Sequence, residues 1–130
     1  MLKEIGELTS EVVKLTLDAA VLRHKIIANN IANANTKGFS PQRLSFESHI
    51  ANIYKQLNAQ DKDSVIGEIK NIRTSFKNGE YIENSNEDPV QLDMEMVKLA
   101  ENTLRYRAIL EGYNKYTSII KMSISGEGGR

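Results

Sequence analysis

The fold is decided by the segment IGELTSEVVKLTLDAAVLRHKIIANNIAN, residues 5–33, in which apolar side chains recur at alternating spacings of three and four. This spacing is the a/d rhythm of a heptad and predicts one long amphipathic helix. The residues on the rhythm are Ile5, Leu8, Val12, Leu15, Ala19, Leu22 and Ile26. Because other apolar residues widen this stripe, we expect the helix to cover more than one partner surface. The widening residues are Val13, Leu17, Ala20, Ile27 and Ile31.

A second heptad pattern runs from Pro89 to about Ile124 and predicts another long helix. Its seam is Leu92, Met96, Leu99, Thr103, Tyr106, Leu110, Tyr113, Thr117, Ile120 and Ile124. Asp88, Pro89 and Gln91 are expected to be its N-cap, N1 and N3 residues. The Gly-rich residues 125–130 are expected to form a disordered tail.

The segment between the two helices, residues 34–88, is mixed. Residues 46–57 have helical spacing and predict a short amphipathic helix, which a polar linker at 58–64 follows. In residues 65–82 apolar and polar side chains alternate weakly, and Asn78-Gly79 lies between the flanking runs. This pattern is compatible with a small β-hairpin. The predicted fold is therefore mainly α, with helices at 1–33 and 89–124 paired as an antiparallel coiled coil. Residues 34–88 form an elbow and a variable middle segment.

Composition excludes several functional classes. The 130 residues carry 17 basic and 17 acidic side chains, so net charge gives no reason to expect nucleic acid or an anionic membrane as partner. The absence of cysteine excludes disulfides and thiolate metal sites. The two histidines, His24 and His49, lack metal-ligand spacing, and no phosphate-binding or nucleophile motif occurs. We therefore expect no catalytic residue, no metal and no cofactor.

Other polar residues have a simple structural interpretation. The carboxylates Asp93, Glu95 and Glu101 lie among basic residues, which is typical of a solvated helix face. Tyr106 and Tyr113 lie on the heptad seam, which favours packing over base stacking. Four asparagines crowd the end of the first helix: Asn29, Asn30, Asn33 and Asn35. They indicate either a helix C-cap and turn, with Gly38 left-handed, or buried amides that fix a register.

The same stretch carries a family resemblance. Residues 29–39, NNIANANTKGF, resemble the pattern at the end of the N-terminal helix in flagellar axial proteins of the rod and hook. The matching residues, which form the expected assembly motif, are Asn29, Asn30, Ile31, Ala32, Asn33, Thr36, Gly38 and Phe39. Residues 90–96, 99–102 and 104–106 resemble the C-terminal helix of the proximal rod proteins, and the small size of the chain fits that group.

This resemblance implies a structural subunit of the bacterial flagellar basal body. In such proteins the terminal helices are largely disordered in the free monomer and pair when subunits stack into a tube. The implied partners are other rod subunits, an adaptor of the FliE type between rod and membrane ring, and the flagellar type III export apparatus. Composition alone favours a cytoplasmic protein. The resemblance replaces that expectation with the basal body in the periplasmic space, reached without a cleaved signal peptide.

Physical reasoning from the two helices agrees with this interpretation. Helices of about 40–55 Å are too long for a compact globule of this mass, so their seams must pair with each other or with other chains. The residues expected in the coiled-coil interface are Leu8, Val12, Leu15, Leu22, Ile26, Leu92, Met96, Leu99, Tyr106, Leu110, Tyr113 and Ile120. The alternative function is a helical adaptor or export-chaperone binding module, whose helices would be ordered without assembly. The third class, an enzyme, finds no support among the motifs.

Overall fold

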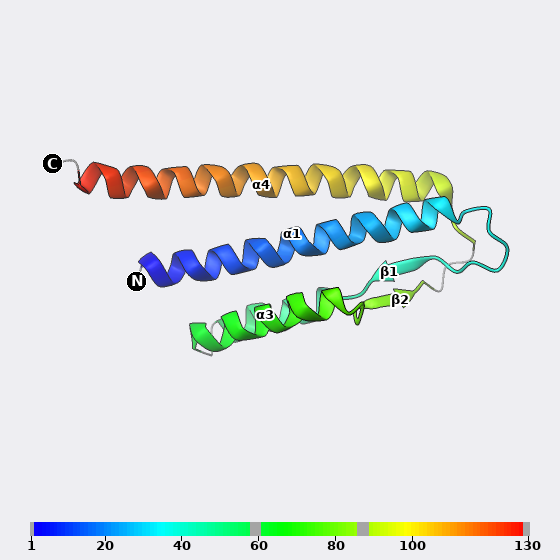
Figure 1. Ribbon diagram of the computed structural model, residues 1–130, viewed down its shortest axis with the longest axis horizontal. Helices are drawn as coiled ribbons and strands as arrows, with labels where there is room; N and C mark the ends of the chain where they lie inside the picture. Colours follow the sequence, from blue (N-terminus) through cyan, green and yellow to red (C-terminus); the bar gives the residue numbers. More distant parts are fainter. Residues whose placement is uncertain (1, 58–60, 86–88, 129–130) are drawn as a thin grey trace.

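The computed structural model describes residues 2–57, 61–85 and 89–128 of the chain. Its elements within these residues are α1 (Leu2–Ala32), β1 (Gln42–Leu44), α2 (Glu47–Leu57), α3 (Lys62–Lys77), β2 (Ile82–Asn84) and α4 (Leu92–Gly128). Helix α1 lies between α4 on one side and α3 on the other, and α4 runs antiparallel to α1 (Figure 1). The prediction of a mainly helical chain with two long terminal helices side by side is confirmed.

Helix α1 ends as its sequence indicates. Regular helix stops at Ala32, and the next residues form turns in which Thr36 N–H bonds Asn33 C=O and Phe39 N–H bonds Thr36 C=O. Gly38 has φ of 82°, a left-handed conformation that glycine adopts without the steric cost of a Cβ. The predicted turn with a left-handed Gly38 is confirmed, and it returns the chain toward β1.

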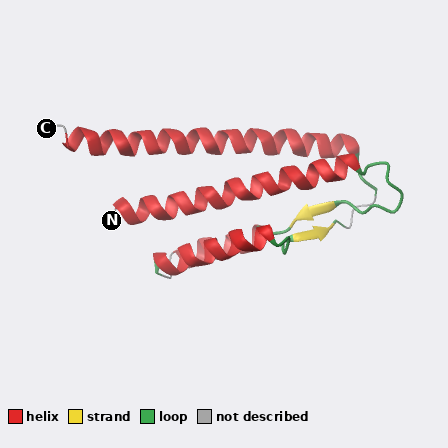
Figure 2. Ribbon diagram, in the orientation of Figure 1, coloured by secondary structure: helices red, strands yellow, loops and turns green. Residues whose placement is uncertain are grey.

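The middle segment contains a sheet, but not the hairpin that the sequence suggested. Strands β1 and β2 pair antiparallel, with Arg43 opposite Glu83, although 37 residues and two helices separate the strands (Figure 2). Residues 62–77 are helical, so the weak alternation read there was misleading. Gly79, at φ of 71°, ends α3 and is not a hairpin turn. Its N–H bonds Phe76 C=O, and Glu80 N–H bonds Ser75 C=O, which is a Schellman motif.

The hydrophobic core lies between α1 and the middle segment. It joins buried residues of α1, β1, α2 and α3 with Phe46, whose ring meets the Phe76 ring edge to face at 5.2 Å. The members are Leu15, Ala19, Ile26, Leu44, Phe46, Ile53, Val65, Ile69, Ile72 and Phe76. None of them belongs to α4. The predicted short helix at 46–57 is confirmed by α2, which supplies Ile53 to this core.

Helix α4 differs from its prediction at both ends. It begins at Leu92, and Gln91 C=O accepts the first helical bond, from Glu95 N–H. Gln91 therefore occupies the N-cap position and not N3, and Pro89 precedes the helix. Asp88 lies outside the described residues. At the other end α4 continues to Gly128, past the predicted end near Ile124, so residues 125–128 are helical and not a disordered tail. Within the described residues, no helix is long and apolar enough to span a bilayer.

Candidate assembly surface

Helix α1 uses two different faces. The heptad residues Leu15, Ala19 and Ile26 are buried in the core with α3, and Leu8, Val12 and Leu22 pack around them. This core contains no residue of α4, although Ile26 also lines a hollow shared with that helix, so the predicted interface residues of α1 pack largely on the middle segment. The widening residues Ala20 and Ile27 are buried outside that core, and each lines a hollow shared with α4. The expectation of more than one partner surface on this helix is confirmed.

Asn30 is the polar centre of the contact between the two long helices. Its side chain is 1% exposed, and its amide pairs with both backbone groups of Gln42. Oδ1 accepts the Gln42 N–H at 2.9 Å, and Nδ2 donates to the Gln42 carbonyl at 2.9 Å. Nδ2 also lies 3.3 Å from Glu95 Oε2 on α4. One side chain thus connects α1, β1 and α4.

Glu95 is the second half of this contact. It is 5% exposed, and its other oxygen lies 3.3 Å from Lys98 Nζ. The interpretation of Glu95 as a solvated surface charge is wrong, because its carboxylate is buried between Asn30 and Lys98. Sequence spacing gave no signal for this, since Asn30 and Glu95 are 65 residues apart.

Two more hydrogen bonds fix α4 along α1. Asn102 Nδ2 donates to the carbonyl of Ala20 at 2.8 Å, and the Tyr113 hydroxyl donates to Ser10 Oγ at 3.0 Å. With the Asn30–Glu95 contact, these bonds are spaced along the whole antiparallel pair. They set the register in which α4 lies on α1.

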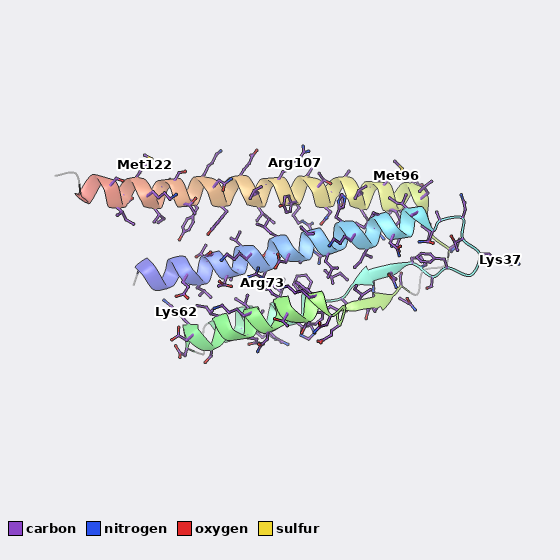
Figure 3. All side chains as sticks on the ribbon, in the orientation of Figure 1. Lys37, Lys62, Arg73, Met96, Arg107 and Met122 are labelled. Atoms are coloured by element: carbon purple, nitrogen blue, oxygen red, sulfur yellow. The ribbon has the colours of Figure 1, made fainter. Side chains whose placement is uncertain are left out.

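An ion-pair cluster fixes the opposite side of α1. Arg73 of α3 places Nε 2.6 Å from Asp18 Oδ2 and Nη1 3.5 Å from Glu11 Oε2. Glu11 is 8% exposed, so its charge needs this partner (Figure 3 shows Arg73 between α3 and α1). Helix α1 is therefore bound to α3 by both apolar packing and charge, and side-chain hydrogen bonds of Asn30, Asn102 and Tyr113 join it to α4.

The residues of the predicted assembly motif have different environments. Asn30 is buried, Ile31, Asn33 and Phe39 are half-buried, and Asn29, Ala32, Thr36 and Gly38 are exposed. Asn33 Nδ2 donates to Asn29 C=O at 2.9 Å, and Thr36 Oγ1 donates to Asn33 Oδ1 at 3.2 Å. Asn29 and Asn33, which continue the heptad rhythm, stabilise the turn. Asn30, which does not, is the buried amide.

The predicted seam of α4 is only half covered by α1. Six of its residues are half-buried: Leu99, Thr103, Tyr106, Tyr113, Thr117 and Ile120. Four are exposed: Leu92 (48%), Met96 (59%), Leu110 (37%) and Ile124 (65%). The described chain thus leaves part of this seam without a partner helix.

Exposed apolar side chains concentrate on α4. Among the described residues, nine of the ten exposed large hydrophobic side chains lie on this helix: Leu92, Met94, Met96, Val97, Leu104, Leu110, Ile119, Met122 and Ile124. The side chains of Met96 and Met122 lie on the edge of α4 away from α1 (Figure 3). Exposed apolar side chains on a helix surface can mark a site of interaction with other chains. The candidate assembly surface is this uncovered part of α4.

The part of the chain that the structure describes holds no candidate metal site. Its residues include no group of three or more His, Asp or Glu side chains that could hold a metal ion. His24 is exposed, and the exposed His49 packs its ring against Tyr81 at 4.8 Å.

Comparison with known proteins finds similarity to flagellar rod proteins. The family model described as "Flagella basal body rod protein" matches residues 16–39, the C-terminal half of α1 and the turn after it. The flagellar basal body rod protein FlgB of Bacillus subtilis is 28% identical over 120 residues, covering 85% of this chain and 88% of the relative. FlgB of Borreliella burgdorferi is 28% identical, covering 69% of this chain and 76% of the relative.

FlgB of Buchnera aphidicola is 24% identical over 123 residues, covering 84% of this chain and 89% of the relative. No solved structure matches the chain significantly. The alignments with these relatives extend over most of the chain, and the family model coincides with the buried Asn30 and the turn at Gly38. The chain is similar to flagellar basal body rod proteins over most of its length.

Proposed function

We propose that this chain is a structural subunit of the flagellar basal-body rod, in which neighbouring subunits cover the apolar surface of α4. The single observation that carries this proposal is the gathering of nine exposed large hydrophobic side chains on one 37-residue helix. Exposed large apolar side chains gathered on one element mark candidate interaction sites. Similarity to flagellar rod proteins suggests the identity of the assembly, and a rod protein has a structural and not a catalytic role.

The assembly also provides the coiled-coil partners that the heptads require. Leu92, Met96 and Leu110 lie on the predicted seam of α4 and are exposed. Helices of other rod subunits would interdigitate with these residues, as knobs pack into holes. The turn at residues 33–39, held by Asn33 and Gly38, would set the direction in which the middle segment leaves the tube.

Finer partners and location follow from the resemblance of the sequence. We place the chain in the periplasmic part of the basal body, at the base of the rod next to the FliE-type adaptor. Its route there is the flagellar type III export apparatus. The zero net charge is consistent with protein partners as opposed to nucleic acid or an anionic membrane.

The alternative, a free-standing adaptor or export chaperone, is not favoured. An adaptor or chaperone would cover its apolar face with one client or one dimer partner. The exposed apolar residues of α4 lie on several sides of the helix, so we expect more than one neighbour to cover them. The named relatives are all rod proteins.

Motility tests the proposal. Leu104 is 68% exposed on α4, so Leu104→Asp should leave the monomer folded but prevent its incorporation into the rod. Leu22 and Leu99 are less suitable, because both are half-buried and a charge there would also disturb the fold. The matched control is Asn71→Asp, an exposed position on α3. Cells that carry only the Leu104→Asp chain should not swim, whereas the Asn71→Asp cells should swim normally. Normal swimming with Leu104→Asp would reject the role of α4.

A further inference from the structure

The face of α4 that lies opposite its contact with α1 carries an apolar stripe of its own. At 3.6 residues per turn, five exposed large hydrophobic side chains of α4 lie within about 40° of Ala108 around the helix axis. They are Met94, Val97, Leu104, Ile119 and Met122, the last of which lies on the edge of α4 away from α1 (Figure 3). Asn102 and Tyr113, which bond to α1, lie about 120° and about 140° from Ala108. The stripe is therefore a second surface of α4, separate from the contact with α1.

Two charged residues lie on this stripe. Glu101 and Lys115 are both exposed, and each lies about 20° from Ala108 around the axis. Neither takes part in the ion pairs of the described residues. Both charges are therefore available to a partner.

The stripe is symmetric in composition about Ala108. Glu101 precedes Ala108 by seven residues, and Lys115 follows it by seven. The apolar residues are placed in the same way, at eleven residues (Val97 and Ile119) and at fourteen (Met94 and Met122) on either side. Two such helices, antiparallel and with their Ala108 residues at the same level, therefore place Glu101 opposite Lys115 and each of these apolar side chains opposite another.

We propose that a second copy of this chain covers the stripe, in an antiparallel dimer whose two-fold axis passes between the two Ala108 residues. The dimer contains two Glu101–Lys115 ion pairs, one on each side of the axis. The exposed apolar side chains of the two helices pack against one another over about 42 Å, the distance from Met94 to Met122 at 1.5 Å per residue.

The charges favour the antiparallel arrangement over the parallel one. Parallel copies in register would place Glu101 opposite Glu101 and Lys115 opposite Lys115, and like charges brought together across an interface oppose association. The antiparallel arrangement replaces both repulsions by attractions.

Small residues allow the two helices to approach each other near the axis. Ala108 lies at the axis, and Gly112 lies four residues further along, at the level of Leu104 of the second copy. A glycine inside an exposed helix destabilises that helix, and a Cβ added at Gly112 would meet nothing within 4 Å in the single chain. In the dimer, the missing side chain of Gly112 leaves room for Leu104.

Such a dimer is closed. Both copies use the same surface, so the contact is isologous and adds no third subunit. On the proposed function, on which this consequence rests, the dimer covers the apolar face of α4 before assembly and dissociates when neighbouring rod subunits cover that face. The stripe then has two alternative occupants, a second copy and the rod.

Cysteine cross-linking tests the position of the axis on the full-length chain, which contains no native cysteine. In an Ala108→Cys chain the two thiols meet at the axis, so oxidation should give a disulfide-linked dimer. The matched control is Ala100→Cys, an exposed alanine of the same helix whose two copies would lie about 24 Å apart along the axis and should cross-link at least tenfold less. Equal cross-linking of the two variants, or none of Ala108→Cys, would overturn the proposal.

Charge exchange tests the ion pairs by sedimentation equilibrium. The wild-type chain should form dimers, and no larger oligomer, as its concentration rises. Glu101→Lys and Lys115→Glu should each raise the dimer dissociation constant at least tenfold, because each places like charges opposite one another. The double variant Glu101→Lys/Lys115→Glu has the composition of the wild type and should return the constant to within about threefold of the wild-type value. A double variant as weak as the single ones, or a wild-type chain that stays monomeric at millimolar concentration or forms larger oligomers, would overturn the dimer.

The two proposals fail differently. A monomeric wild-type chain would overturn the dimer and leave the motility result expected for Leu104→Asp unchanged. Normal swimming of Leu104→Asp cells would reject the role of α4 in the rod and leave the sedimentation results unchanged.

Discussion

Asn30 Nδ2 lies 3.3 Å from Glu95 Oε2, and this contact joins the C-terminal end of α1 to the N-terminal end of α4. The same amide accepts a hydrogen bond from the Gln42 N–H and donates one to the Gln42 carbonyl. It thus takes the place of a neighbouring strand on that edge of β1. Asn30 lies within residues 16–39, which the rod-protein family model matches, whereas Glu95 lies outside that segment. The energetic weight of the contact can be measured.

Replacing Asn30 by alanine should lower the free energy of unfolding by about 2–4 kcal/mol, because the buried N–H and C=O of Gln42 and the Glu95 carboxylate lose a partner. Chemical denaturation followed by circular dichroism measures this loss. The adjacent Asn29→Ala is the control. Asn29 is exposed, so that change should cost about 0.5 kcal/mol or less. Equal losses for the two variants would mean that the Asn30 contacts contribute little.

Two glycines should respond to alanine with opposite signs. Gly79 has φ of 71°, so Gly79→Ala should destabilise the chain by about 1–2 kcal/mol. Gly67 lies within α3, and an added Cβ would meet nothing within 4 Å, so Gly67→Ala should stabilise by about 0.5–1 kcal/mol. Thermal melts of both variants measure the signs. A stabilising Gly79→Ala would contradict the helix C-cap described for α3.

Hydrogen exchange on the dilute chain should separate the two long helices. Helix α1 shares the apolar core and the Arg73 ion pairs with α3, whereas the buried residues of α4 are only the polar Glu95 and Asn102. Amide protons of residues 10–27 should therefore be protected longer than those of residues 104–124. The resemblance implied disorder of both terminal helices in the monomer; the core contacts of α1 restrict this expectation to α4. Equal protection would show that α4 is stable without neighbours.

Much of this architecture could be predicted from the sequence, because heptad spacing is a local signal. Both long helices were predicted correctly, from the heptad spacing of Leu8 to Ile26 and from the seam around Leu99 and Tyr106. The turn was predicted from Gly38. The partner of the α1 stripe could not be predicted. It depends on α3, which was missed because Asn78-Gly79 is typical of both a hairpin turn and a helix end.

The polar contacts between the helices could not be predicted from the sequence, for a different reason. Asn30 lies off the heptad rhythm, and its partners Gln42 and Glu95 are 12 and 65 residues away. Only the folded chain brings these groups together, so neither spacing nor residue type distinguishes Asn30 from Asn29. Likewise Glu95 resembles its exposed neighbours Asp93 and Glu101 in the sequence, and tertiary burial alone makes it different.

The measurement that most directly tests the burial of α4 by neighbouring subunits is thiol labelling at position 104. A Leu104→Cys chain carries a single cysteine, at a side chain that is 68% exposed in the monomer. The variant must first support swimming, so that its basal bodies are intact. We then expect a maleimide to label the purified free chain completely. In intact basal bodies it should label the chain at least tenfold more slowly, with full reactivity after denaturation. Equal labelling of the free chain and the basal bodies would contradict the account.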